Sequence, residues 1–147
     1  MRTKTEETTT ELPARLRLAI ARTARRMRQE AGDELSPSMT AALATIENHG
    51  PLTPSALAEL ERIKRPTATR VLQRLEEDGL IERSADPSDG RSAVVCVTKD
   101  GGALLKKLRS RKNAYLARRL RELPPEDVDA LRRAADVLER LLDGERR

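Results

Sequence analysis

Apolar residues recur at helical spacing in six segments of the chain, and cap or stop residues separate these segments. The first segment runs from Leu12 to Glu34, where a thin apolar stripe is accompanied by six arginines between Arg15 and Arg28. A helix with so narrow an apolar face is not stable alone, so we expect it to pack against other helices or a second chain. Residues 1–11 lack this pattern and are expected to form a flexible arm.

Three shorter helical segments follow within about 40 residues, which is the spacing of a helix-turn-helix core. Ser36 and Thr53 each precede a proline, and this combination caps a helix and opens its first turn. The third helix is predicted from Pro66 to about Asp78, with Gly79 as its C-terminal stop. In this order of elements, the third helix is the one that would read a duplex.

The periodicity then changes to two short runs with the composition of strands, residues 80–84 and 92–98. Asp, Pro, Ser and Gly fill the segment between them and suit a hairpin turn. Arg91 is a long cation of the kind that enters a narrow minor groove, and Asp89 is placed to brace it through a short-range ion pair. A plain exposed hairpin is the alternative, but a hairpin directly after a helix-turn-helix favours a wing.

Two further helices complete the pattern. A basic helix is predicted over residues 103–123, after two glycines, and Pro124 with Pro125 ends it. The last helix carries an apolar stripe from Val128 to Leu142. The predicted fold class is therefore mainly α with a small β-hairpin wing, a winged helix-turn-helix.

Composition narrows the choice of partner. Charged residues make up 36% of the chain, the net charge is +5 and the sequence pI is about 9.9, which favours a polyanion. The charge is unevenly placed, with five basic and no acidic residues from Arg62 to Arg74, and eight basic and no acidic residues from Lys106 to Arg121. The chain has no Trp, no Phe and one Tyr, so the core must consist of Leu, Val, Ile, Ala and Met.

The predicted helix at residues 66–78 has an apolar and a polar face at 3.6 residues per turn. Its polar face can donate to guanine, pair with adenine or contact thymine, and the cations at its start suit phosphate. An ordinary surface helix is the alternative, but such faces usually mix charge signs. The carboxylates at residues 76–78 are expected to end the DNA-facing surface and to pair with arginines elsewhere. The candidate DNA-binding residues are Lys64, Arg65, Pro66, Thr67, Thr69, Arg70, Gln73, Arg74, Asp89 and Arg91.

Other candidate chemistry is sparse. A single cysteine excludes an internal disulfide and suits a reducing cytosol, and Cys96, in an apolar strand, is expected to be an inert thiol. His49 is the only histidine and has no ligand cluster at metal-binding spacing. There is no phosphate-binding loop, no catalytic constellation and no apolar run of the roughly 20 residues that a membrane span needs. We expect a cytoplasmic protein that is not an enzyme and has no catalytic residue, metal or cofactor.

The chain resembles the MarR family of winged-helix transcriptional regulators over about Leu12 to Leu142. The segments that carry the resemblance are 50–58, 65–70, 75–81 and 86–91, with Val97–Thr98 behind. One departure is segment 60–64, where many members have a Gly and a Ser before the recognition helix, so the turn and its phosphate contacts differ here.

This resemblance implies a homodimer, with a dimerisation helix at residues 12–34, a DNA-binding lobe at residues 35–100 and dimerisation helices at residues 101–147. It places the wing aspartate and arginine of the family on Asp89 and Arg91. It further implies a repressor, and a small effector, often an anionic aromatic, bound between the dimer region and the DNA-binding lobe. With almost no aromatic residue to stack on, a pocket of this kind in this chain would be aliphatic and lined by arginine.

Three readings of the sequence thus remain. The leading one is a dimeric, sequence-specific regulator whose two recognition helices enter major grooves roughly 34 Å apart and read an inverted repeat in double-stranded DNA. The second is a winged-helix module that binds an acidic protein through its basic helices. The third is a nucleoid-type protein that binds DNA without sequence preference.

Overall fold

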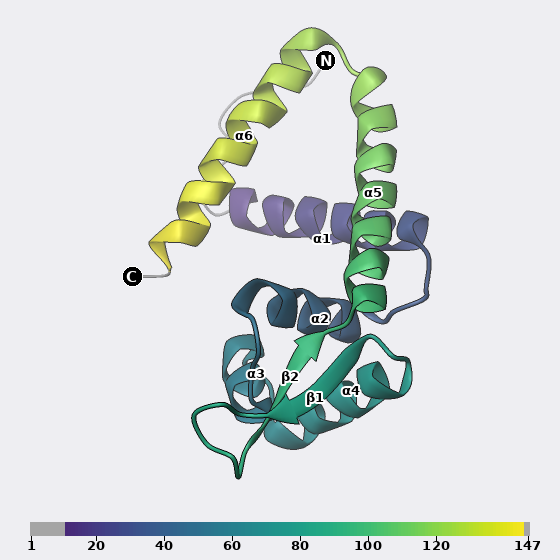
Figure 1. The fold of residues 1–147 in the computed structure, drawn as a ribbon. Coiled ribbons are helices and arrows are strands. Elements are labelled where there is room, and N and C mark those ends of the chain that lie inside the picture. The colour runs from purple at the N-terminus through teal and green to yellow at the C-terminus, as the bar shows by residue number, and fades with distance from the viewer. Residues whose placement is uncertain (1–10, 146–147) are drawn as a thin grey trace. The chain divides into compact units, whose positions relative to one another are not determined.

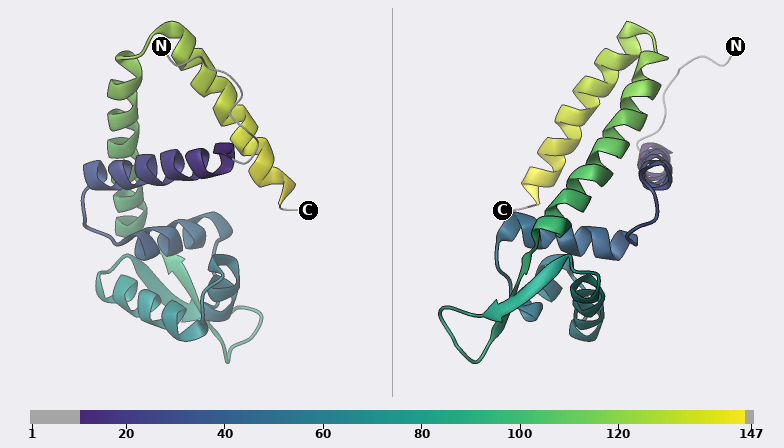
Figure 2. Two further views of the ribbon diagram at one scale, coloured as in Figure 1. Left: turned by 180° about the vertical axis from the view of Figure 1, so that it is seen from behind. Right: turned by 45° about the vertical axis from the view of Figure 1, so that its right-hand side comes forward.

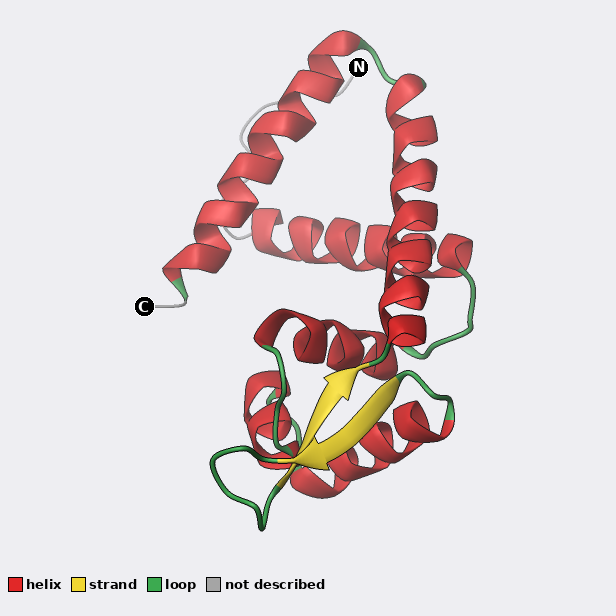
Figure 3. Cartoon of the chain, in the orientation of Figure 1, coloured by secondary structure: helices red, strands yellow, loops and turns green. Residues whose placement is uncertain are grey.

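The computed structural model describes residues 11–145, so the predicted arm at residues 1–11 lies outside the described residues apart from Glu11. The described part is mainly α with one antiparallel hairpin, as predicted (Figures 1 and 3). It forms two compact units, which divide between Lys112 and Asn113. The elements are α1 (Glu11–Ala31), α2 (Pro37–His49), α3 (Pro54–Glu61), α4 (Arg65–Glu77), β1 (Ile81–Ala85), β2 (Ala93–Val97), α5 (Lys99–Arg121) and α6 (Pro125–Gly144).

The predicted caps form the helix boundaries. The hydroxyl of Ser36 accepts a hydrogen bond of 3.2 Å from the Met39 N–H at the start of α2. Thr53 caps α3 in the same way, by accepting a bond of 3.1 Å from the Ala56 N–H. Each hydroxyl satisfies one of the N–H groups that a helix start leaves without an intrahelical partner. Short-range interactions alone therefore set where α2 and α3 begin.

The end of α4 is a Schellman motif around Gly79, whose φ is +72°. The Gly79 N–H donates to the Glu76 carbonyl at 3.0 Å, and the Leu80 N–H donates to the Leu75 carbonyl at 2.9 Å. A residue with a Cβ adopts this backbone conformation only at a cost, which explains why the stop is a glycine. The turn directs Leu80, which is buried, into the core and starts β1.

The wing sheet contains β1 and β2, which pair with Ile81 opposite Val97 and Ala85 opposite Ala93. A further backbone contact, which we did not predict from the sequence, adds one residue to this sheet. Leu52, in the α2–α3 connection, exchanges two backbone hydrogen bonds with Val95, of 3.0 and 2.8 Å. A bridge of one residue has no alternation pattern, so periodicity cannot reveal it. It fixes the base of the wing to the helices of the lobe (Figure 2).

One aliphatic core joins the lobe to the neighbouring ends of α1 and α5. No aromatic side chain belongs to it, and it holds Ala31 of α1 and Leu105 and Leu108 of α5. The side chains of this core that are fully buried are Leu43, Ile46, Leu57, Leu72, Leu75, Val95 and Leu105. Burial of their apolar surface is the main favourable contribution to folding of this unit. It holds α4 against α2 and α3.

The predicted start of the basic helix was wrong. We expected Gly101 and Gly102 to precede it, but α5 begins at Lys99 and contains both glycines. Thr98 explains the early start, because its hydroxyl accepts a bond of 3.1 Å from the Gly101 N–H and donates one of 2.7 Å to the Gly79 carbonyl. Gly101 is buried, and a Cβ there would collide with the Leu80 carbonyl oxygen. The glycine permits a close helix–strand contact.

Two long helices keep apolar side chains on the surface of the chain. α1 ends at Ala31, three residues earlier than predicted, because Gly32 turns the backbone with a φ of +97°. Its side chains Leu12, Leu16, Leu18 and Ile20 are 42–49% exposed. No residue of α6 is buried, although this helix is strongly amphipathic. Its exposed apolar residues are Leu131, Val137, Leu138, Leu141 and Leu142.

Candidate nucleic-acid interface

α4 separates the core from a polar face. Ala68, Leu72 and Leu75 have no exposed surface, so this side of the helix is fixed in the core. The candidate residues on the other side are all exposed: Lys64, Arg65, Pro66, Thr67, Thr69, Arg70, Gln73 and Arg74. The structure therefore brings the predicted α4 residues together on one accessible surface. Their side chains are long enough to reach base edges if the helix lies in a major groove.

One of the three carboxylates at the end of α4 pairs with an arginine elsewhere, as predicted, and the other two instead contact residues of the helix itself. Glu76 accepts a bond of 2.7 Å from Nε of Arg83 on β1. On the helix itself, the Asp78 carboxylate lies 3.6 Å from Nε of Arg74, and Glu77 accepts a bond of 3.3 Å from Gln73. These contacts neutralise the acids, but they also engage the last turn of the predicted reading face. Arg70, one turn earlier, is the candidate base-reading arginine without a carboxylate partner in the described chain.

The start of α4 is open to an anion. Lys64 is the N-cap residue, and no side chain caps the helix there. A lysine has no acceptor, so the N–H groups of Arg65 and Thr67 remain for a ligand, while Pro66 has no N–H to satisfy. A phosphate at this position would meet a helix N-terminus and two cationic side chains. The division between backbone contacts here and base contacts further along α4 stays a prediction.

The turn between α3 and α4 contains a residue that sequence reasoning did not include in the site. Arg62 caps α3 with φ +51° and ψ +45° and is the one non-glycine residue with positive φ between residues 11 and 145. Its N–H donates to Glu59 at 3.2 Å, and Ile63 closes the turn by donating to Ala58 at 3.0 Å. Many family members carry a Gly and a Ser in this segment. This difference was the only feature of the sequence that pointed to an unusual turn here. In this chain a cation in a left-handed conformation closes the turn.

We predict opposite effects of Arg62→Gly on stability and on DNA binding. Glycine adopts the left-handed region freely, so the free energy of unfolding should rise by roughly 1 kcal/mol, as urea denaturation would measure. The same change removes an exposed cation next to α4, so duplex affinity should fall. Arg62→Ala is the matched control, because it removes the cation and keeps the strain. A glycine variant no more stable than the alanine variant would show that Arg62 carries no backbone strain.

The loop of the wing is shaped by two aspartates. The Asp86 carboxylate accepts bonds from the Ser88 N–H and hydroxyl, at 2.9 and 2.8 Å. The Asp89 carboxylate accepts a bond of 3.0 Å from the Arg91 N–H and one of 3.4 Å from the Ser92 hydroxyl. The expected ion pair between Asp89 and the Arg91 guanidinium is therefore corrected, since Asp89 holds the Arg91 backbone. These local side-chain bonds act as Asx turns and leave the Arg91 side chain exposed.

The bonds from Ser88 hold the pKa of Asp86 below its ordinary value, because they stabilise the charged carboxylate. A lowered pKa means that the turn has its full stability above the usual aspartate range and loses it as the pH falls toward the folded-state pKa. The two bonds from Ser88 to Asp86 therefore keep their full strength at neutral pH.

The comparisons with known proteins agree with this geometry. Residues 35–93, from the end of α1 to the wing, match the model of the MarR family. An uncharacterised HTH-type transcriptional regulator of Mycobacterium bovis is 38% identical over 133 residues, which are 90% of this chain and 93% of the relative. The chain belongs to the MarR family. It is a DNA-binding transcriptional regulator with a winged helix-turn-helix and not an enzyme.

Solved structures support the MarR fold along most of the chain. A putative transcriptional regulator of Pseudomonas aeruginosa is 31% identical, with a TM-score of 0.85 over 93% of this chain and 97% of its own. A variant of S. aureus MepR bound to an oligodeoxyribonucleotide has the same fold at 20% identity, with a TM-score of 0.68 over 94% of this chain and 99% of its own.

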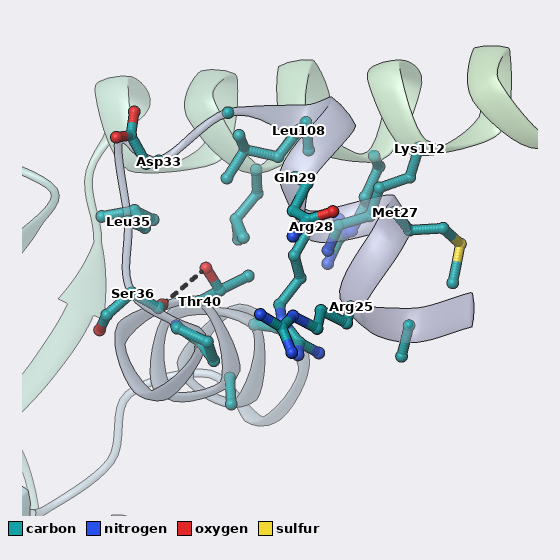
Figure 4. Close-up of a pocket in the computed structure, with 18 residues that line it drawn as sticks. Arg25, Met27, Arg28, Gln29, Asp33, Leu35, Ser36, Thr40, Leu108 and Lys112 are labelled. Atoms are coloured by element: carbon teal, nitrogen blue, oxygen red, sulfur yellow. Dashed lines mark hydrogen bonds between the residues drawn. The ribbon is translucent and has the colours of Figure 1, made fainter. Parts of the chain in front are cut away.

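A cavity of about 1090 Å³ lies between α1, α2 and α5 of this MarR-family chain (Figure 4). Its lining combines aliphatic with charged and polar residues, and no aromatic residue is among them. Figure 4 shows Arg25 and Arg28 extending from α1 in the direction of α2. Arg109 and Lys112 of α5 add two further cations to the lining, which has Asp33 as its single acid. We name it the α1–α2–α5 cavity.

Cys96 has the surroundings expected of an unreactive thiol. It lies partly buried on β2, with its sulfur 3.8 Å from the Glu82 carbonyl oxygen and 3.8 Å from a Glu82 carboxylate oxygen. Burial and the charge of Glu82 raise the pKa of the thiol, which disfavours the nucleophilic thiolate. Peroxide-sensing members of the family use a cysteine in the first helix, and Glu11–Ala31 contains none. Among the described residues, no three His, Cys, Asp or Glu side chains form a potential metal site, and no helix is long and apolar enough to span a membrane.

Arg91 provides a test of the wing. We predict that Arg91→Ala weakens duplex binding by on the order of 1 kcal/mol and leaves base preference in the major groove unchanged. Its side chain is exposed at the wing, whereas we expect base preference to depend on α4. Fluorescence anisotropy on matched and mismatched duplexes measures both effects. Wild-type affinity in this variant would rule out the wing contact.

Proposed function

We propose that this MarR-family regulator is a homodimeric, cytoplasmic repressor that binds a pseudo-palindromic operator. The observation that carries the proposal is the exposed face of α4, on which Arg70 and its neighbours stand opposite a fully buried apolar face. In this assignment, Thr67, Thr69, Arg70, Gln73 and Arg74 contact bases. The start of α4 contacts the phosphates through Lys64, Arg65 and Pro66. In the wing, Asp89 orders the turn so that Arg91 enters the minor groove.

The second chain is needed to cover the apolar faces of the long helices. Leu16 and Ile20 of α1 and Leu141 and Leu142 of α6 are 42–63% exposed, which is unusual for side chains at helical spacing. We assign residues 12–34 and 101–147 to dimerisation and residues 35–100 to DNA binding. A dimer with twofold symmetry would present two α4 helices to successive major grooves of an inverted repeat. Sedimentation should detect dimers, and a stable folded monomer at micromolar concentration would contradict this assignment.

A randomised duplex library tests the proposal against its alternatives. The full chain is incubated with the library, and bound duplexes are recovered and sequenced. An enriched inverted repeat supports a sequence-specific regulator. Binding without enrichment would identify a nucleoid-type protein. If no duplex binds, the remaining hypothesis is a winged-helix module that binds an acidic protein. Transcription from a promoter that carries the enriched repeat then shows whether the protein represses.

The α1–α2–α5 cavity favours an effector that combines an anionic head with an aliphatic body. Arg25, Arg28 and Lys112 have no carboxylate partner among residues 11–145, whereas Arg109 is bound to Glu47 at 2.9 Å. Unpaired cations at an apolar cavity can bind a carboxylate whose chain fills the aliphatic part. The lack of aromatic walls favours an aliphatic over an aromatic anion.

Decanoate is a suitable probe for this cavity, and we predict that it raises the Kd of the selected duplex by about tenfold. Decanol, which has the same chain without the charge, is the control and should have little effect. Arg28→Gln should weaken decanoate binding and leave duplex affinity without decanoate unchanged. Equal effects of decanoate and decanol would show that the cations do not select the ligand.

A further inference from the structure

The α1–α2 loop, residues 32–36, borders two hollows. It forms part of the wall of the α1–α2–α5 cavity. It also lines a smaller hollow of about 540 Å³, together with Arg70 and Arg74 of α4. Asp33 and Ser36 border both hollows. A displacement of this loop therefore changes the ligand cavity and the surroundings of α4 together.

α5 holds this loop through an ionic contact. Nη1 of Arg111 donates to the Ala31 carbonyl at 2.7 Å and to Oε1 of Glu34 at 2.8 Å. Nζ of Lys107, one turn earlier on α5, lies 3.8 Å from the same Glu34 oxygen. The bond from Arg111 is the main reason that the pKa of Glu34 lies below its ordinary value. Arg111 thus joins the last carbonyl of α1, the loop and α5.

The loop is also shaped to keep this contact. Gly32 has a φ of +97°, and a Cβ there would lie 2.5 Å from Oε2 of Glu34 and 3.2 Å from Nη1 of Arg111. The glycine thus leaves room for the carboxylate to fold back onto the end of α1. The two residues after Glu34 connect the loop to the DNA-binding lobe. Leu35 is buried in the core, and Ser36 caps α2.

We propose that the Arg111–Glu34 contact positions the α1–α2 loop, and that this loop transmits occupation of the α1–α2–α5 cavity to α4. A ligand in the cavity would displace Asp33 and Ser36, and the altered loop would shift the side of α4 that carries Arg70. DNA affinity and ligand affinity would then change reciprocally, as linkage requires. This inference rests on the proposed function, because it assumes a duplex on α4 and an anion in the cavity.

The contact is suited to positioning more than to stability. Arg111 and Glu34 side chains are 38% and 37% exposed, and ion pairs with this exposure contribute little to the free energy of unfolding. The chain also provides a matched comparison. Arg109 of α5 binds Glu47 of α2 at 2.9 Å with similar exposure, but this pair does not involve the loop. Glu34→Gln removes the charge that faces Arg111 and Lys107, and Glu47→Gln removes the charge that faces Arg109. Both variants weaken an ionic contact of α5, but only the first acts on the loop.

Hydrogen exchange of the full chain with the selected duplex tests the α4 side. In the wild type, duplex binding should slow exchange of the amides at residues 33–35 by about fivefold. This slowing should be lost in Glu34→Gln and kept in Glu47→Gln, with both variants still binding the duplex. Loop exchange that does not respond to the duplex in the wild type, or responds equally in both variants, overturns the inference while the proposed function stands.

Decanoate tests the cavity side. In the wild type it should raise the Kd of the duplex by about tenfold, and in Glu47→Gln by at least as much, because Arg109 at the cavity loses its carboxylate partner. In Glu34→Gln and Arg111→Met the increase should be less than about threefold. Duplex affinity without decanoate should stay within about twofold of the wild type in all of them. Equal effects of decanoate in Glu34→Gln and Glu47→Gln, or none in the wild type, overturn the inference. A wild type that binds no duplex overturns the proposed function and this inference with it.

Discussion

Replacing Arg70 with alanine is expected to weaken operator binding by about 1–3 kcal/mol per half-site, or roughly 5- to 150-fold in Kd, and to relax base preference at particular positions. Arg70 is exposed at the middle of α4, and the opposite side of the helix is held by Ala68 and Leu72, which are fully buried. The core fixes the orientation of α4 about its own axis, so the Arg70 side chain leaves the helix in a defined direction. A bidentate contact between a guanidinium and guanine requires such a defined direction.

The measurement compares Kd values for the selected operator and for duplexes with single substitutions. Arg74→Ala is the matched control, because it removes the same charge from the same helix. Asp78 lies 3.6 Å from Arg74 and partly neutralises it, so this variant should lose less affinity than Arg70→Ala. An Arg70→Ala protein with unchanged selectivity would show that α4 does not read the operator through this residue.

The second large effect concerns stability. Gly101→Ala is expected to lower the free energy of unfolding by about 1–3 kcal/mol, because the new methyl group would collide with the Leu80 carbonyl oxygen and lie 2.9 Å from Cγ1 of Val97. The Leu80 carbonyl also accepts a hydrogen bond of 3.0 Å from the Thr98 N–H, so it cannot move away freely. The gain in helix propensity from alanine is smaller than this cost.

Gly102→Ala is the control for this prediction. The neighbouring glycine lies in the same turn of α5, and a Cβ there would meet no atom within 4 Å. The helix should therefore gain roughly 0.5–1 kcal/mol from the alanine. Urea denaturation at one fixed protomer concentration measures both variants, since stability depends on concentration in a dimer. Two variants of equal stability would contradict the close contact at Gly101.

Features set by neighbours in the sequence could be predicted from the sequence. The caps at Ser36 and Thr53 and the stop at Gly79 act within four residues, and the apolar faces follow from helical spacing. The two faces of α4 were therefore predicted correctly. Among the acids at its end, Glu76 pairs with an arginine elsewhere as expected, but the other two contact residues of α4 itself. The roles of these residues on DNA stay predictions.

The remaining features depend on contacts that no local pattern encodes. The start of α5 depends on the bond from the Thr98 hydroxyl to the Gly79 carbonyl. Leu52 joins the wing sheet across 43 residues, from position 52 to 95. The sequence places Asp89 close to Arg91. It does not show whether the carboxylate bonds the backbone N–H of Arg91 or its guanidinium. Arg62 was not assigned to the site, because its left-handed backbone is visible only in the structure.

The carboxylates at the end of α4 have a consequence for the response to salt. Binding of each unpaired cation to a phosphate releases a condensed counterion, and log K falls with log salt concentration by about 0.9 for each such contact. Arg74 and Arg83 already face Asp78 and Glu76. Among the described residues that the proposal places on or beside the phosphates, this leaves Arg62, Lys64 and Arg65 without such partners. A dimer would then show a slope of about −5, instead of about −9 if Arg74 and Arg83 also contacted phosphates. The acidic end of α4 thereby moderates the loss of operator affinity when the ionic strength rises.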